Sequence, residues 1–415
     1  MIATFRDRDF TLLWFAGLVS LTGDWILLTA LPVYVFEQTA SVLATALVLI
    51  VSALPGVFLG SVVGVFVDRW DRRRTMVVVS LCQALVIPGF LVAHLNDWLW
   101  LVYVVLFTAA TLGQFFQPAE NALLPTLVPP ERLVTANTLN ALNDNLARIV
   151  GPSIGGVVLV WAGFSGTILL DSASFLVAAG LIARIARPRL TPLAEHAAGE
   201  DIAVEATSVR REWAAGLRVI RAHPVIRGVF TVAGLATFAD SILSALLVPF
   251  VLRVAGGDAA LIGVLLTVRG IAGVLGGVVV ARRPPPAARP PPRGQSVDHR
   301  TWHRPPGQRP HGPRDRRRHH ILLGPAIVAW LTAQRALLQA HTADAYRGRV
   351  FGAFGTVNTI AFLLGASIAG VVGDRVGIVP LLDAAGVSFV MAGLVAIALL
   401  RDTPSLAVDG SSPDA

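Results

Sequence analysis

The strongest constraint on this chain is a series of long apolar runs that recur along its 415 residues. A helix of about 20 apolar residues crosses a ~30 Å hydrocarbon core. Hydrophobic residues make up 54% of the sequence and charged residues 14%, which is a composition typical of membrane proteins rather than soluble ones. We therefore predict an all-α polytopic membrane protein. The runs are Leu12–Phe36, Val42–Val67, Met76–Leu95, Trp98–Ala119, Leu139–Ala162, Gly166–Ala186, Ile226–Leu252, Ala259–Ala281, Val350–Val372 and Ile378–Leu400.

The excess positive charge is confined to one segment. Of the formal charge of +8, residues 282–320 supply 11 Arg and 2 Asp, so the rest of the chain is close to neutral and a basic surface for nucleic acid is excluded. No P-loop of the form GxxxxGK[ST] occurs, which removes ATP-driven work by this chain. No spacing of His or Cys supports a metal site, and we expect no cofactor.

Arginine placement predicts the orientation in the membrane. Arg6 and Arg8 precede the first span, Arg72 follows the second, and Arg132 precedes the fifth, whereas the alternate connections EQTAS, HLND and GFSG contain no arginine. By the positive-inside rule both termini are cytoplasmic. We expect a multi-pass protein of the cytoplasmic membrane with a six-helix half over residues 1–187, a middle loop at 188–225, a second half at 226–403 and a polar tail at 404–415.

The two halves resemble each other in sequence. TGDWILLTALP in the first half is similar to FADSILSALLVP in the second, as GSVVGVFVDR is to GVLGGVVVAR. Such a parallel repeat of six helices is expected in a transporter that binds its substrate between the halves. Asp171 and Asp383 come close to the predicted membrane faces, so we expect them to be structural anchors. The matched positions are Asp24 with Asp240, Arg132 with Arg347, Asn143 with Asn358, Gly155 with Gly370, and Asp171 with Asp383.

The segment at 282–336 interrupts this repeat. Spans nine and ten are expected there, but the segment is rich in Arg, Pro, His and Gly, and arginine at mid-bilayer costs ~2.5–3.5 kcal/mol even on a lenient scale. The spacing between matched positions is nearly the same before and after it, so residues are replaced rather than lost. We interpret spans nine and ten as corrupted by a pair of compensating frameshifts. The alternative is a genuine basic loop that serves as a linker or a partner tail, and Ile321–Leu338 is a weak eleventh span.

Several motifs resemble those of the major facilitator superfamily. GVFVDRWDRRR at 64–74 is similar to the loop signature G-x-x-x-D-R-x-G-R-R, with Asp71 in place of the second glycine, and GPSIGG at 151–156 is similar to the helix-five motif of drug and proton antiporters. FRDRDFTLLWFAGLVSLTGDW, DSASFL and FGAFGTVNTIAFLLGASIAGVVGD together resemble the subgroup that contains the enterobactin exporter and macrolide efflux proteins, the transmembrane secretion effectors. The resemblance implies a fold of two six-helix halves.

The resemblance also implies two functional motifs. The loop residues Gly64, Asp68, Arg69 and Arg72 match a gate that holds the cytoplasmic side shut. In physical terms, Asp68 can accept hydrogen bonds from a facing helix N-terminus, and the arginines can bridge to carboxylates at neighbouring helix ends. The same arginines could instead only set the topology.

The helix-five motif has two interpretations. Small residues at Gly151, Gly155 and Gly156 allow close helix contact, and Pro152 bends the helix where it should rock against a helix of the other half. Simple packing is one interpretation. The other, which depends on the resemblance, is that the bend limits proton leak and favours export.

Charged residues within the spans are the candidate site. Asp24 and Asp240 lie near the middle of spans one and seven, and Arg148 lies about three turns into span five. Intramembrane charges normally face a cavity or each other. We expect Asp24, with Asp240 second, to carry a coupling proton, and Arg148 to be its partner or a substrate contact. Asp144 and Arg148 share a helix face and could form a salt bridge; Asp240 could pair with Arg269. The alternative for Asp24 is a cap at a helix break after Gly23.

These observations predict a proton-coupled exporter of small amphipathic molecules that works by alternating access. Its partners are the substrate, protons and the lipid bilayer, and we expect a monomer. Two alternatives stay open. One is a non-transporting product, either frameshifted or a scaffold with a basic loop that binds anionic lipid; the other is a proton symporter for uptake.

Resequencing of codons 275–345 tests the frameshift hypothesis. We expect one inserted or deleted base near each end of this region, whose correction restores two apolar spans. If the printed frame is instead confirmed, the second half lacks two helices as written, and the non-transporting alternative gains support.

Overall fold

The computed structural model describes residues 2–59, 63, 67, 70–186, 223–282, 334, 337–342 and 344–400. Within these ranges, eight helices are long and apolar enough to cross a membrane, which confirms the all-α polytopic prediction. The helices are α1 (Arg8–Thr39), α2 (Val42–Leu59), α4 (Arg72–Val86), α5 (Gly89–Leu95), α6 (Leu99–Leu123), α7 (Leu133–Ala183), α10 (Pro224–Pro249) with a π-helical turn (Phe250–Val254), α11 (Ala259–Arg282), α13 (Asp344–Val376) and α14 (Ile378–Leu400).

Helix α7 contains two membrane spans. Its 51 residues are more than twice the number that crosses a ~30 Å core. The break falls at Gly163, whose φ of 66° and ψ of −174° are not helical. A positive φ is readily adopted by glycine, which has no Cβ to clash. Gly163 lies in the connection predicted between the spans Leu139–Ala162 and Gly166–Ala186, so the prediction of two spans is confirmed.

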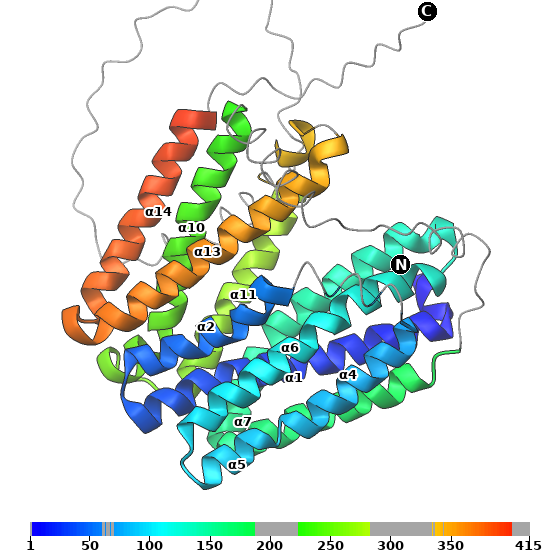
Figure 1. The fold of residues 1–415 in the computed structure, drawn as a ribbon, viewed down its shortest axis with the longest axis horizontal. Helices are drawn as coiled ribbons and strands as arrows, with labels where there is room; N and C mark the ends of the chain where they lie inside the picture. The colour runs from blue at the N-terminus through cyan, green and yellow to red at the C-terminus, as the bar shows by residue number, and fades with distance from the viewer. Residues whose placement is uncertain are drawn as a thin grey trace, which may run out of the picture.

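The helices form two groups (Figure 1). Helices α1 to α7 make one group, in which α1 packs along α7 and α4 packs between α6 and α7; α10, α13 and α14 pack together in the other. Helix α11 follows α10 in the second half of the sequence but packs mainly against α7. The groups meet at the end of the molecule that holds the α1–α2 connection at 39–42 and the α13–α14 connection at 376–378, here called the hairpin end. A core cluster shared by both groups lies there, with Phe36 and Val42 from one group and Ile242 and Ala369 from the other.

The packing repeats from one group to the other, as the sequence repeat predicts. The first part of α7 packs against α1, and α13 packs against α10. The matched asparagines contribute to these contacts: Asn143 donates to the Trp14 carbonyl of α1 at 2.8 Å, and Asn358 accepts from the Thr237 hydroxyl of α10 at 2.6 Å. The second half is therefore built on the same helix pairing as the first.

The helix-five motif joins the two groups. A Cβ on Gly156 would lie 3.1 Å from the Ala259 carbonyl oxygen of α11, and a Cβ on Gly263 would lie 2.7 Å from the Pro152 carbonyl oxygen. The atoms met are backbone atoms, so a larger side chain at either position would push the two helices apart. Ser153 and Thr267 share a hydrogen bond of 2.5 Å beside them. The motif thus lies against α11, a helix of the other half, and its role in the transport cycle stays a prediction.

A second contact between the groups joins α2 and α13. A Cβ on Gly370 would lie 2.9 Å from the Ala46 Cβ, and one on Gly373 would lie 2.7 Å from Val42 Cγ1. The segment GASIAG at 365–370 resembles GPSIGG at 151–156, in a register shifted by one residue from the pairing of Gly155 with Gly370. Related segments of the two halves thus make related contacts, α7 with α11 and α13 with α2.

Several predicted boundaries change in the structure. Helix α4 begins at Arg72 rather than Met76, because the Asp71 carboxylate accepts a hydrogen bond from the Arg74 N–H at 2.7 Å and caps the helix. Helix α6 extends to Leu123, beyond the predicted end at Ala119. The middle loop at 188–225 and the segment at 282–336 fall almost entirely outside the described residues, as does the weak span at 321–338.

Replacing Gly263 by leucine tests the backbone contact between α7 and α11. Overpacking of a close contact costs ~1–3 kcal/mol, so we expect Gly263→Leu to lower the thermal unfolding midpoint of the detergent-purified protein. Gly180→Leu is the matched control, because a Cβ there meets no heavy atom within 4 Å. Equal midpoints for the two variants would contradict the contact.

Candidate functional site

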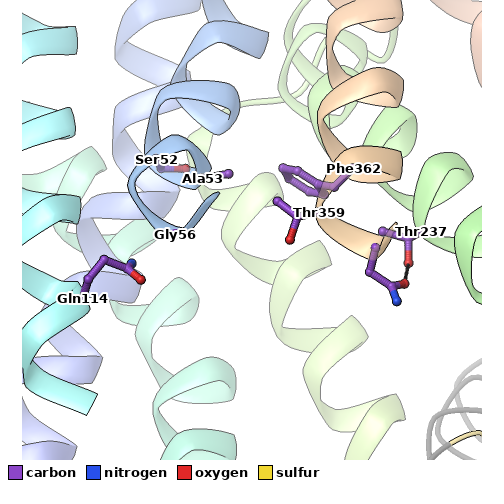
Figure 2. Close-up of a pocket in the computed structure, with 8 residues that line it drawn as sticks. Ser52, Ala53, Gly56, Gln114, Thr237, Thr359 and Phe362 are labelled. Carbon is purple, nitrogen blue, oxygen red and sulfur yellow. Dashed lines mark hydrogen bonds between the residues drawn. The ribbon is translucent and has the colours of Figure 1, made fainter. Parts of the chain in front are cut away.

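A cavity of about 450 Å³ lies between the two groups of helices. Figure 2 shows side chains of α2 and α6 on one side of it and side chains of α10 and α13 on the other. Both halves of the repeat therefore contribute to one cavity, as expected of a transporter of this architecture. Its lining residues are Ser52, Ala53, Gly56, Gln114, Thr237, Asn358, Thr359 and Phe362.

Among the described residues, the lining mixes polar and apolar side chains and includes no charged one. Gln114 presents an amide from α6, the bonded pair of Thr237 and Asn358 lies opposite, and Phe362 adds an aromatic face. Such a surface offers hydrogen bonds and apolar contact without selecting for a charge. Sequence reasoning missed these residues as a site because only charged side chains stand out within apolar spans; the pairing of Asn358 with Asn143 in the repeat was the one available signal.

Asp24 lies beside a second carboxyl that the sequence analysis placed elsewhere. A Cβ on Gly23 would collide with the Asp171 carboxyl and the Ser174 hydroxyl, so Asp171 presses against the backbone of α1 and interacts with the adjacent Asp24 carboxyl. Asp171 is 0% exposed and its Oδ2 has no hydrogen-bond partner, whereas Asp24 is exposed. The prediction of Asp171 near a membrane face is wrong, because it lies level with the middle of α1.

Arg148 contacts an aromatic ring rather than a carboxylate. Its guanidinium lies 5.5 Å from the centroid of the Trp25 ring, a cation–π arrangement. Asp144 lies near enough to interact electrostatically with Arg148, but among the described residues no ion pair within 4.0 Å joins these two. The predicted salt bridge is therefore absent here. Arg148 comes near Asp24 through its contact with Trp25, the residue that follows Asp24 in the chain.

Asp240 and Arg269 form the ion pair expected from the sequence. The Arg269 guanidinium donates to the Asp240 carboxylate and also reaches the Ser244 hydroxyl at 3.5 Å. Both side chains are partly exposed, at 39% and 47%, so solvent screening keeps the contribution of this pair to stability small. Asp24 and Asp240 match in the repeat yet have different partners, a carboxyl in one half and a guanidinium in the other.

Glu120 is a further buried acid that sequence reasoning missed. It is 6% exposed on α6, lies near Gly17 of α1, and interacts with Asn140 and Asp144 of α7. The predicted span ended one residue earlier, at Ala119, and Glu120 was not considered as a site residue. A carboxyl directly after a predicted span is the signal by which Glu120 could have been identified.

The gate motif is only partly described. Gly64, Asp68 and Arg69 lie outside the described residues. Arg72 donates to the Ala122 carbonyl at the C-terminal end of α6 at 3.2 Å, and Arg73 donates to the Ile182 and Ala183 carbonyls at the end of α7. These arginines thus bind helix C-termini, where the helix dipole favours positive charge, instead of the carboxylates expected for Arg72.

Two helical halves of repeated packing, with a cavity that is lined by both of them, define a membrane transporter of the major facilitator type. The transmembrane secretion effector family matches residues 1–284, so the chain belongs to that family. Its members are membrane transporters and not enzymes, and the chain is accordingly a transporter with a small-molecule substrate.

Curated relatives of this chain include transporters that are similar over nearly its whole length and others that are similar over about half of it. The MFS-type transporter YfiS of Bacillus subtilis is 24% identical over 91% of this chain and 90% of its own length. The multidrug efflux pump Tap of Mycolicibacterium fortuitum is 27% identical over 94% of this chain and 95% of its own length. Macrolide efflux protein A of Streptococcus pyogenes is 27% identical over 57% of each.

Solved structures share the fold at low identity. A bacterial homologue of the human lysosomal transporter Spinster, in an inward-facing and unoccupied conformation, matches with a TM-score of 0.65 at 16% identity, over 97% of this chain and 99% of that one. A bacterial homologue of the iron transporter ferroportin, in an inward-facing state, matches with a TM-score of 0.63 at 14% identity, over 94% and 98%. These likenesses support the fold class predicted from the sequence.

Proposed function

We propose that this protein exports small amphipathic molecules, driven by protons that move inward. The observation that carries the proposal is the cavity between the halves, to which both halves contribute polar and aromatic side chains. A molecule bound there is held by α2 and α6 on one side and by α10 and α13 on the other. Movement of one half against the other would expose it to either face of the membrane in turn.

The cavity chemistry supports an amphipathic substrate class. Gln114, Thr237 and Asn358 offer hydrogen bonds, Phe362 offers an apolar face, and none of the described lining residues is charged. Two relatives are named as a macrolide efflux protein and a multidrug efflux pump. Neutral or weakly charged molecules with polar and apolar parts fit this lining best.

The paired carboxyls Asp24 and Asp171 are the proposed coupling site. Two ionised carboxylates so close in an apolar surrounding repel each other, which favours binding of a proton by the pair. Asp24 is the more exposed of the two and Asp171 is fully buried, so in this proposal Asp24 exchanges the proton while Asp171 senses its charge. The ion pair of Asp240 with Arg269 is the second candidate, and Arg148 is a proposed substrate contact near Trp25.

Orientation follows from the arginines at the end of the molecule opposite the hairpin end. Arg72 and Arg73 bind helix ends there, and Arg132 forms an ion pair of 3.0 Å with Asp7. By the positive-inside rule this end faces the cytoplasm and the hairpin end faces outward. We propose a monomer in the cytoplasmic membrane with both termini inside, with residues 1–187 and 226–403 as its halves.

The two motifs have proposed roles in the cycle. Gly64, Asp68, Arg69 and Arg72 close the cytoplasmic side when the halves rotate. The bend and close packing at Gly151, Pro152, Gly155 and Gly156 limit proton leak through the contact with α11.

Uptake by proton symport and a non-transporting product are the competing functions. The same cavity would serve a symporter, so the direction of transport separates uptake from export. The segment at 282–336 as written favours a non-transporting product. Cellular accumulation of a substrate distinguishes all three: it falls with export, rises with uptake and does not change without transport.

Accumulation of ethidium and of a macrolide in an efflux-deficient bacterial host tests the proposal. We expect the wild-type protein to lower accumulation, and Asp24→Asn and Asp171→Asn to restore it to the level of cells without the protein, because neither variant can bind and release the proton. Asp258→Asn, which alters a carboxylate that caps α11, is expected to behave as wild type at matched membrane abundance. Full export by Asp24→Asn would contradict the coupling site, and unchanged accumulation with the wild-type protein would contradict export.

A further inference from the structure

A carboxylate at the end of α13 binds the beginning of α2 across the boundary between the halves. Asp374 accepts hydrogen bonds from the backbone N–H of Val42 at 3.1 Å and of Leu43 at 3.4 Å. It also accepts from the Ser41 hydroxyl at 3.1 Å. One side chain of the second half therefore makes all of these bonds to a single helix end of the first half.

The N-terminus of α2 lacks other partners for these groups. The first N–H groups of a helix have no intrahelical acceptor. The Ser41 hydroxyl accepts from the Ala44 N–H at 3.2 Å, and the N–H groups of Val42 and Leu43 donate to Asp374. The negative carboxylate also lies where the helix dipole is positive. The cap of α2 is thus completed by the other half of the protein.

Arg253 makes the complementary contact with the end of α1. Its guanidinium donates to the Ala40 carbonyl, which follows the last turn of α1, and lies 5.1 Å from the centroid of the Phe36 ring. It also lies 3.7 Å from the Asp374 carboxylate. A positive group is therefore placed at the C-terminus of α1 and a negative group at the N-terminus of α2, each where the helix dipole favours it.

The related contact of α7 with α11 has no such group. In the repeat, the position of Asp374 corresponds to about Val160 of α7, and the beginning of α11 is capped by Asp258 of its own half, whose carboxylate accepts from the Leu261 N–H at 2.9 Å. Among the described residues, side-chain hydrogen bonds therefore join the halves at the hairpin end in the contact of α13 with α2, and not in the contact of α7 with α11.

We propose that Asp374 and Arg253, bound to the ends of α1 and α2, form a latch that holds the hairpin end closed in one state of the transport cycle. The proposal rests on alternating access as the proposed function and adds the residues that bias it. Separation of α13 from α2 leaves the N–H groups of Val42 and Leu43 without their acceptor. Water then serves as the acceptor in place of the carboxylate, because the side chains of Arg253 and Asp374 are 44% and 37% exposed. The latch therefore opens and closes reversibly.

The two states differ in the distance between the halves at the hairpin end. Spin labels at Leu95 and Val379, both exposed and on different halves, report that distance by pulsed electron resonance in the full chain with Cys82→Ser. Labels at Val134 and Leu399 report the opposite end. The measurement requires no substrate, so its outcome is independent of whether the protein exports, imports or does not transport.

Loss of the latch is expected to populate a longer distance between Leu95 and Val379. We expect Asp374→Ala and, independently, Arg253→Gln to lower the ratio of closed to open states by about fivefold to tenfold, the size of a lost helix cap. The population with a shorter distance between Val134 and Leu399 rises by the same factor. Asp258→Ala is the matched control, because it removes a cap within one half, and it leaves both distances as in the wild type.

The latch is overturned if both Asp374→Ala and Arg253→Gln keep the wild-type distances. It is also overturned if Asp258→Ala lengthens the distance at the hairpin end as much as they do, since the change would then come from general loosening. Arg253→Gln alters an exposed side chain, so it tests the latch even if Asp374→Ala fails to fold.

Discussion

Contact between helix backbones at glycine holds the two halves of this protein together. In lipid, apolar side chains gain little by leaving the solvent, so helices associate through close packing and hydrogen bonds. Gly156 and Gly263 bring α7 against α11, and Gly370 brings α13 against α2. The cavity depends on these contacts, because its two walls belong to different halves that the glycine packing brings together.

The helix packing also determines which charged side chains come into contact with one another and with helix ends. Asp171 lies against α1 only because Gly23 has no side chain, and that position places it beside Asp24. At the hairpin end, Asp374 and Arg253 bind the ends of α1 and α2. The small residues therefore determine where the halves touch, and the charges determine which arrangement of the halves is favoured.

Much of the fold could be predicted from the sequence, since hydrophobic length and arginine placement are strong local signals. The spans, the break near Gly163 and the repeat all follow from them. Sites formed between distant segments could not be predicted in the same way. Asp171 was misplaced and Glu120 missed because each comes near a predicted span end, where the boundary is uncertain by several residues. Asp374 and Arg253 were not recognised, since their partners are backbone groups that no sequence pattern marks. Spans nine and ten stay a prediction.

Transport by the purified protein in liposomes tests the account most directly. With an imposed pH gradient, acidic on the side of the hairpin end, we predict movement of a macrolide or ethidium toward that side, and loss of this movement in Asp24→Asn. Collapse of the gradient should abolish it in the wild type. Equal movement with and without the gradient, or none in protein that is folded and correctly oriented, would contradict a proton-driven exporter.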